Sequence, residues 1–162
     1  MSDFRRLAIY NALYPRSIWA WGRNINGQLG DGTTTERLTP KKIGDKKWQS
    51  VSAGDSYSLG IDADGYLWSW GRNINGQLGD ETMIDRLAPV KIGDKKWQSV
   101  SAGEDTSLGI DTDGYLWAWG RNDATFGDGT INLQGRSTPK KIGDKKWQSV
   151  SAGGNHSLGI MK

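Results

Sequence analysis

The stretch KIGDKKWQSVSAG occurs three times without a change, at residues 42–54, 91–103 and 141–153. The tryptophans of the three copies, Trp48, Trp97 and Trp147, are separated by 49 and then 50 residues. A constant period of this size is typical of proteins built from tandem structural repeats. The chain is therefore predicted to contain three copies of one unit, at 18–66, 67–115 and 116–162.

Composition indicates one globular unit, because the 162 residues are 35% hydrophobic and 24% charged. The apolar runs are too short to cross a bilayer, and the lead at 1–15 lacks the apolar core of a signal peptide. We therefore expect no membrane insertion and no Sec export. A compact repeat module of this kind resembles small bacterial and phage structural proteins, so the expected location is the bacterial cytoplasm or a phage virion. The absence of cysteine excludes disulfides and thiolate metal sites. The net charge of +3 permits an acidic partner without requiring one.

The segments YLWSWG (66–71) and YLWAWG (115–120) are predicted to be strands. Two tryptophans two residues apart in a strand lie on the same face, which must be buried. The preceding DADG and DTDG sequences predict a tight hairpin turn, with SLGI as the strand that leads into it.

The repeated thirteen residues predict a second hairpin, with its turn at Gly-Asp (44–45, 93–94 and 143–144). The small residues of SAG indicate a place where backbones approach closely, as at the centre of a radial structure. Four short antiparallel strands per repeat are typical of a β-propeller blade. The sequence therefore predicts an all-β fold with three blades per chain, and the nine tryptophans are expected to pack between blades.

The segment LWSWGRNINGQLGDET (67–82), together with SAGxxxSLGI and the DG that follows it, resembles the regulator of chromosome condensation repeat family. The resemblance covers residues 18–160, although the third copy departs from it at NDATFGDGT (122–130). It implies propeller blades, seven of which form the ring in known members. Those members include a nucleotide exchange factor that also binds chromatin, a plant UV-B photoreceptor and a secreted inhibitor of β-lactamases. The resemblance thus implies a toroidal binding surface and not one reaction.

No catalytic set emerges from the sequence. The DxDG sequences could suggest calcium, but a calcium loop needs further oxygen ligands and a distal glutamate, so a plain turn is favoured. His156 is the single histidine, so neither a histidine metal cluster nor a Cys-His dyad can form. Nucleotide-binding and hydrolase motifs are also missing. We therefore expect no enzyme activity, no metal and no cofactor.

Basic turns are the strongest candidate for a binding site. The blade repeat places pairs of lysines in an arc on one side of the propeller, and such an arc could attract an anionic glycan, nucleic acid or an acidic protein. The alternative is a solvated turn that keeps a strand edge from aggregating. The candidate residues are Lys46, Lys47, Lys95, Lys96, Lys145 and Lys146.

Three blades cannot form a ring, because propellers close with about 4–8 blades. We expect closure by oligomerisation, with six blades from a dimer favoured. The lead at 1–17 is predicted to be an arm or short helix that docks on the propeller or on a larger assembly. The resulting prediction is a non-enzymatic oligomeric structural or binding module, which could be a tail or capsid-associated phage component attached through the arm. The alternative is a protein-binding regulator or inhibitor of an enzyme or GTPase.

Overall fold

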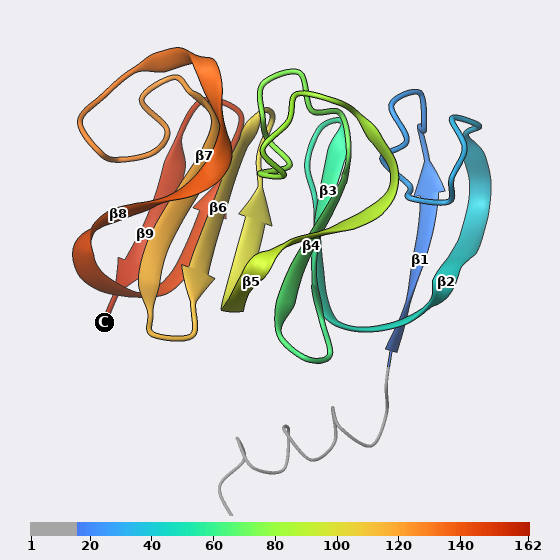
Figure 1. Ribbon diagram of the computed structural model, residues 1–162, viewed down its shortest axis with the longest axis horizontal. Coiled ribbons are helices and arrows are strands. Elements are labelled where there is room, and N and C mark those ends of the chain that lie inside the picture. The colour runs from blue at the N-terminus through green and yellow to red at the C-terminus, as the bar shows by residue number, and fades with distance from the viewer. Residues whose placement is uncertain (1–15) are drawn as a thin grey trace, which may run out of the picture.

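The computed structural model describes residues 16–162, and all regular structure in this part of the chain is β. Neighbouring strands pair antiparallel in chain order, so β1 and β9 form the two edges (Figure 1). Of the predicted N-terminal arm, residues 16–17 belong to β1, and the rest lies outside the described residues. The strands are β1 (Arg16–Gly22), β2 (Arg37–Ala53), β3 (Tyr57–Asp62), β4 (Tyr66–Gly71), β5 (Arg86–Ala102), β6 (Thr106–Asp111), β7 (Tyr115–Asn122), β8 (Asn132–Ala152) and β9 (Ser157–Met161).

The long strands β2, β5 and β8 are each shared between two blades. The first half of β2 pairs with β1, and its second half pairs with β3; β5 and β8 repeat this pattern with their own neighbours. The strands of three blades are thus distributed over two complete blades and two half-blades. We name them the N-terminal half-blade (16–43), blade A (48–92), blade B (97–142) and the C-terminal half-blade (147–161).

The predicted hairpin at Gly-Asp is wrong, whereas the predicted DxDG hairpin is confirmed. Gly44 adopts a φ of +56°, but β2 continues through it and its two halves pair with different strands. One left-handed residue is enough to bend a strand without reversing it. At the DxDG turn, β3 and β4 do pair, and the Asp62 carboxylate accepts hydrogen bonds from the main-chain nitrogens of Asp64 and Tyr66.

The core lies between the blades. The ring of Trp97 lies 5.7 Å from that of Trp119, and both pack against the fully buried Leu59 and Ile61 of blade A. Trp48 contacts Trp70 at the same distance and packs against the N-terminal half-blade. The tryptophans of blades A and B therefore pack between blades as predicted, and such aromatic pairs add about 0.5–1.5 kcal/mol beyond their buried area. Trp19 and Trp21 differ from the prediction, because they are exposed at the N-terminal end.

The SAG segments of neighbouring repeats approach closely, which confirms the prediction from their small residues. A Cβ atom on Gly54 would lie 2.5 Å from the carbonyl oxygen of Gly103, so no side chain fits there. The buried Tyr57 hydroxyl of blade A donates to the Thr106 carbonyl (2.7 Å) and accepts from Ser107 Oγ (2.9 Å) of blade B. Main-chain proximity and buried hydrogen bonds thus join the blades along this line.

In each repeat, one aspartate accepts hydrogen bonds within the loop that follows β1, β4 or β7. In the third repeat, Asp128 accepts hydrogen bonds from Lys140 Nζ (2.8 Å) and Thr130 Oγ1 (2.7 Å). Burial alone raises the pKa of Asp128, but these hydrogen bonds outweigh it and lower the pKa to about 2. The same balance lowers the pKa values of Asp31 and Asp80 in the other repeats.

These shifts predict acid sensitivity. A carboxyl group whose pKa falls from 3.8 when unfolded to about 2 when folded stabilises the fold above about pH 4, and this contribution is lost as the pH falls through about 2. We expect the free energy of unfolding, measured by urea titration, to decrease between these pH values. Asp128→Asn should reduce this pH dependence relative to the parent chain. An equal dependence in both proteins would contradict the role assigned to Asp128.

Candidate functional site

The three Gly-Asp bends and the two DxDG hairpins lie along one edge of the blades (Figure 1). We call the bends at 44–47, 93–96 and 143–146 the basic rim, because each carries one of the predicted lysine pairs. The left-handed glycine that opens each bend turns the chain from the outer strand of one blade to the inner strand of the next. The structure therefore places all six predicted lysines on this rim, two at each bend.

The first lysine of a pair contacts its own blade. Lys46 Nζ lies 4.0 Å from the centre of the Trp68 ring and 3.8 Å from the carboxylate of Asp62. The Trp68 indole donates to the same carboxylate at 2.8 Å. A lysine over an indole gains a cation–π attraction, so Lys46 contributes to the fold as well as to the surface charge.

Blade B repeats this arrangement around Asp111. Lys95 Nζ lies 4.4 Å from the centre of the Trp117 ring and 3.5 Å from the Asp111 carboxylate. Burial alone raises the pKa of Asp111, but hydrogen bonds from the Tyr115 main chain and the Trp117 indole outweigh it, and the Lys95 charge adds to them. The pKa of Asp111 therefore lies below its usual value, and the carboxylate stays charged beside the lysine.

The second lysine of a pair contacts the preceding blade. Lys96 Nζ lies 4.0 Å from the centre of the Tyr66 ring and donates to the main-chain oxygen of Asp64. Lys91 approaches the same ring at 3.8 Å. In the next blade, Lys146 and Lys141 lie over Tyr115 in the same way, at 3.6 and 3.7 Å.

Lys47 and Lys145 differ from the other four candidates because the repeats differ at their partner positions. Ser17 stands where Tyr66 receives Lys96, and Met161 stands where Asp111 receives Lys95. Within the described residues, neither lysine therefore has the ring or carboxylate that holds its counterparts. Their role in binding stays a prediction. In this part of the chain, their ammonium groups lack the contacts that hold the ammonium groups of the other four lysines.

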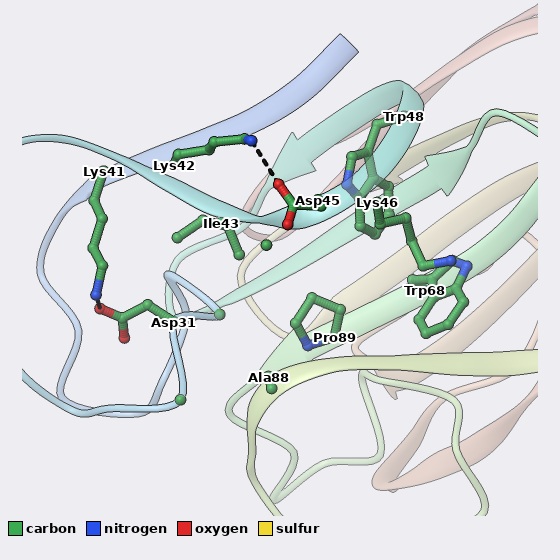
Figure 2. Close-up of a pocket in the computed structure, with 13 residues that line it drawn as sticks. Asp31, Lys41, Lys42, Ile43, Asp45, Lys46, Trp48, Trp68, Ala88 and Pro89 are labelled. Atoms are coloured by element: carbon green, nitrogen blue, oxygen red, sulfur yellow. Dashed lines mark hydrogen bonds and ion pairs between the residues drawn. The ribbon is translucent and has the colours of Figure 1, made fainter. Parts of the chain in front are cut away.

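A groove of about 490 Å³ lies beside the rim, between the first halves of β2 and β5 (Figure 2). Figure 2 shows Pro89 and Trp68 on one side of it and Ile43 and Asp45 on the other. The apolar lining comes from Ile43, Trp48, Trp68, Ala88 and Pro89, and the charged lining comes from Asp31, Lys41, Lys42, Asp45 and Lys46.

Sequence reasoning missed this groove, although a difference between repeats indicates it. Lys41 stands where the second repeat has Val90. Val90 packs against the core between blades A and B, whereas Lys41 turns to Asp31, with Nζ 3.1 Å from the carboxylate. At this position the first interface therefore has a charged side chain on the wall of the groove, where the second repeat has an apolar one.

Two further observations concern residues 16–162. No group of three or more histidine, cysteine, aspartate or glutamate side chains is arranged there to hold a metal ion. The same residues contain no helix of the length and apolarity needed to cross a membrane. The rim and groove bring the ammonium group of Lys46 close to the indole ring of Trp68.

Solved structures share this arrangement of strands. Prp20p from Saccharomyces cerevisiae matches 91% of this chain at 24% identity and a TM-score of 0.78. Yeast RCC1 (Prp20) bound to Kap60 matches 89% at 25% identity and 0.73. Human WBSCR16 matches 84% at 23% identity and 0.73. The matches cover 40%, 37% and 38% of those chains, so this chain spans about two fifths of their length.

Sequence comparison identifies the repeats themselves. No curated protein matches the chain. The family model for the regulator of chromosome condensation (RCC1) repeat matches residues 17–61 and 64–110, and a second model of this repeat matches 48–77 and 97–127. Since these matches cover more than half of the chain and its strands form propeller blades, the chain belongs to the regulator of chromosome condensation (RCC1) repeat family.

Proposed function

We propose that this chain is a non-enzymatic binding module whose propeller ring is completed by further copies of the chain. The observation that carries the proposal is the pair of half-blades at opposite ends, each with exposed large apolar side chains. A monomer rarely exposes contiguous apolar patches of more than a few hundred Å². The exposed side chains are Trp19 and Trp21 of the N-terminal half-blade, with Val51 of blade A at the same end, and Leu158, Ile160 and Met161 of the C-terminal half-blade.

The likeness to solved structures supports binding of proteins. Prp20p is described by its binding to Gsp1p and histones, and yeast RCC1 (Prp20) was solved bound to Kap60. We propose that this chain binds an acidic protein or another anionic surface, such as a glycan, through the basic rim and the adjoining groove. Ammonium groups attract the anion, and the indole rings of Trp48 and Trp68 that line the groove provide apolar contact.

The proposed setting is a phage particle, as a tail or capsid-associated component, or the bacterial cytoplasm. Residues 1–17 would attach the propeller to the particle. The second candidate is a regulator or inhibitor of an enzyme or GTPase, which the binding of Gsp1p by Prp20p favours. Co-purification decides between them: association with intact particles supports the first candidate, and a stoichiometric complex with one soluble host enzyme supports the second.

The oligomeric mass tests the assembly. Native mass spectrometry should give twice 17.8 kDa, because two chains supply six blades and propellers close with about 4–8. Thermal unfolding should depend on protein concentration, since dissociation accompanies it. A monomer that unfolds cooperatively at a concentration-independent temperature would overturn the proposal.

The lysines of the rim should separate into two classes. Lys47→Ser with Lys145→Ser should lower the salt concentration that elutes the protein from heparin, used as an anionic probe, and leave the free energy of unfolding unchanged within about 0.5 kcal/mol. The matched variant, Lys46→Ser with Lys95→Ser, should also destabilise the fold by about 1 kcal/mol per site, because two cation–π contacts and their ion pairs are lost. If the first variant elutes at the same salt concentration as the parent chain, Lys47 and Lys145 do not bind the anion and are only solvated turn residues.

A further inference from the structure

We infer that β9 of one copy pairs with β1 of a second copy, so that the C-terminal half-blade and the N-terminal half-blade form one composite blade. The composite blade rests on the ring closure proposed for this chain and goes beyond it in naming the strands, the register and the contacts. Both partners are copies of the same chain.

The two half-blades are complementary in strand content. The C-terminal half-blade consists of two inner strands, the second half of β8 and β9, and the N-terminal half-blade consists of two outer strands, β1 and the first half of β2. Together they are the four strands of one blade. Because β1 and β9 are the two edges of the sheet and lie at opposite ends of the molecule, they do not meet within one chain (Figure 1).

The complete blades supply the register. In blade A, Leu59 pairs with Ser69 and Gly60 with Trp68, and the equivalent pairs recur between β6 and β7 in blade B. Transferred through the repeat, this register pairs Leu158 with Ala20, and Gly159 with Trp19, across the two copies. The composite blade thus follows a pairing that the chain already forms twice.

Burial shows which contacts are missing at each end. Trp21 is 60% exposed, whereas its counterparts Trp70 and Trp119 in the complete blades are 2% and 0% exposed. Leu158 is 65% exposed, whereas its counterparts Leu59 and Leu108 are 0% and 1% exposed. The side chains at these repeat positions are therefore buried in the complete blades and exposed in the half-blades.

The space for Trp21 is present at the other end of the molecule. A Cβ atom on Gly79 would lie 2.9 Å from the Trp119 ring, but at the equivalent Gly127 nothing lies within 4 Å. A cavity of about 140 Å³ opens at this point and is lined by Gly127, Trp147 and Gly159 among others. Trp21 of the second copy would enter this cavity and contact Gly127 as Trp119 contacts Gly79.

A reciprocal cavity receives Leu158. In the interface between blade B and the C-terminal half-blade, Leu108 belongs to one apolar cluster with Ala118 and Val150. The equivalents of the last two at the N-terminal end are Ala20 and Val51, and they line a cavity of about 170 Å³. Leu158 of the second copy fits there. Two copies fill both pairs of cavities at once and close a six-bladed ring, whereas three copies would give nine blades, beyond the usual range.

A disulfide tests the register. The chain contains no cysteine, so Ala20→Cys with Leu158→Cys introduces the only two thiols. Directly opposed residues of antiparallel strands lie about 4.5–5.5 Å apart between Cα atoms, within the range that a disulfide spans. Mild oxidation should give a covalent dimer on a non-reducing gel, and peptide mass spectrometry should identify the bond between positions 20 and 158. The matched control, Leu38→Cys with Leu158→Cys, should stay monomeric on the gel, because Leu38 is exposed but lies on β2.

A second variant tests the contact without a covalent bond. Trp21→Ala should raise the dimer dissociation constant, measured by sedimentation, by at least about thirtyfold, as expected for a buried aromatic anchor. Ile25→Ala is the control, because Ile25 and its counterpart Ile74 are both exposed whether or not the blade is complete. A dimer that survives Trp21→Ala and forms no bond between positions 20 and 158 overturns the composite blade but leaves the oligomeric binding module intact. A monomeric parent chain overturns both.

Discussion

The tryptophans of blades A and B pack on one another and on the apolar face of the preceding blade. Trp97 and Trp119 of blade B are buried in one cluster with Leu59 and Ile61 of blade A. A single blade is therefore not a stable unit, as in repeat proteins generally, where neighbours bury a core that one repeat cannot bury alone. The dependence of each blade on its neighbour determines which residues must recur in every copy.

This dependence explains four of the invariant positions of KIGDKKWQSVSAG. Its isoleucine and tryptophan enter the interblade core, its first glycine bends the strand from one blade to the next, and its last glycine lies where two main chains approach. A substitution at the isoleucine, the tryptophan or the last glycine of one copy would therefore disturb the contact between two blades. The glycine of SLGI is also required by packing, here within one blade: a Cβ atom on Gly109 would lie 2.5 Å from the Trp97 ring.

Most of the fold was predictable because its signals are local or periodic. The tryptophan spacing predicts a buried face, and DxDG predicts a hairpin that Asp62 then stabilises through its carboxylate. The Gly-Asp bend was mispredicted because a left-handed glycine is compatible with both a hairpin and a bent strand. What distinguishes them is which strand each half of β2 pairs with: the first half pairs with β1 and the second with β3, and the two halves do not pair with each other. The division into two complete blades and two half-blades follows from the same strand pairing.

The candidate site shows where a near-identical repeat carries its specific information. The lysines of the rim were predictable from the repeat, but their surroundings depend on positions where the copies differ, such as Ser17, Met161 and Lys41. Ser17 and Met161 lie on β1 and β9, the two strands that would meet in a composite blade. Lys47 and Lys145, whose partner positions are Ser17 and Met161, therefore border the junction between copies. Ring closure would place both lysines beside the same composite blade. Assembly and recognition of an anionic partner would then depend on one surface, which neither half-blade provides alone.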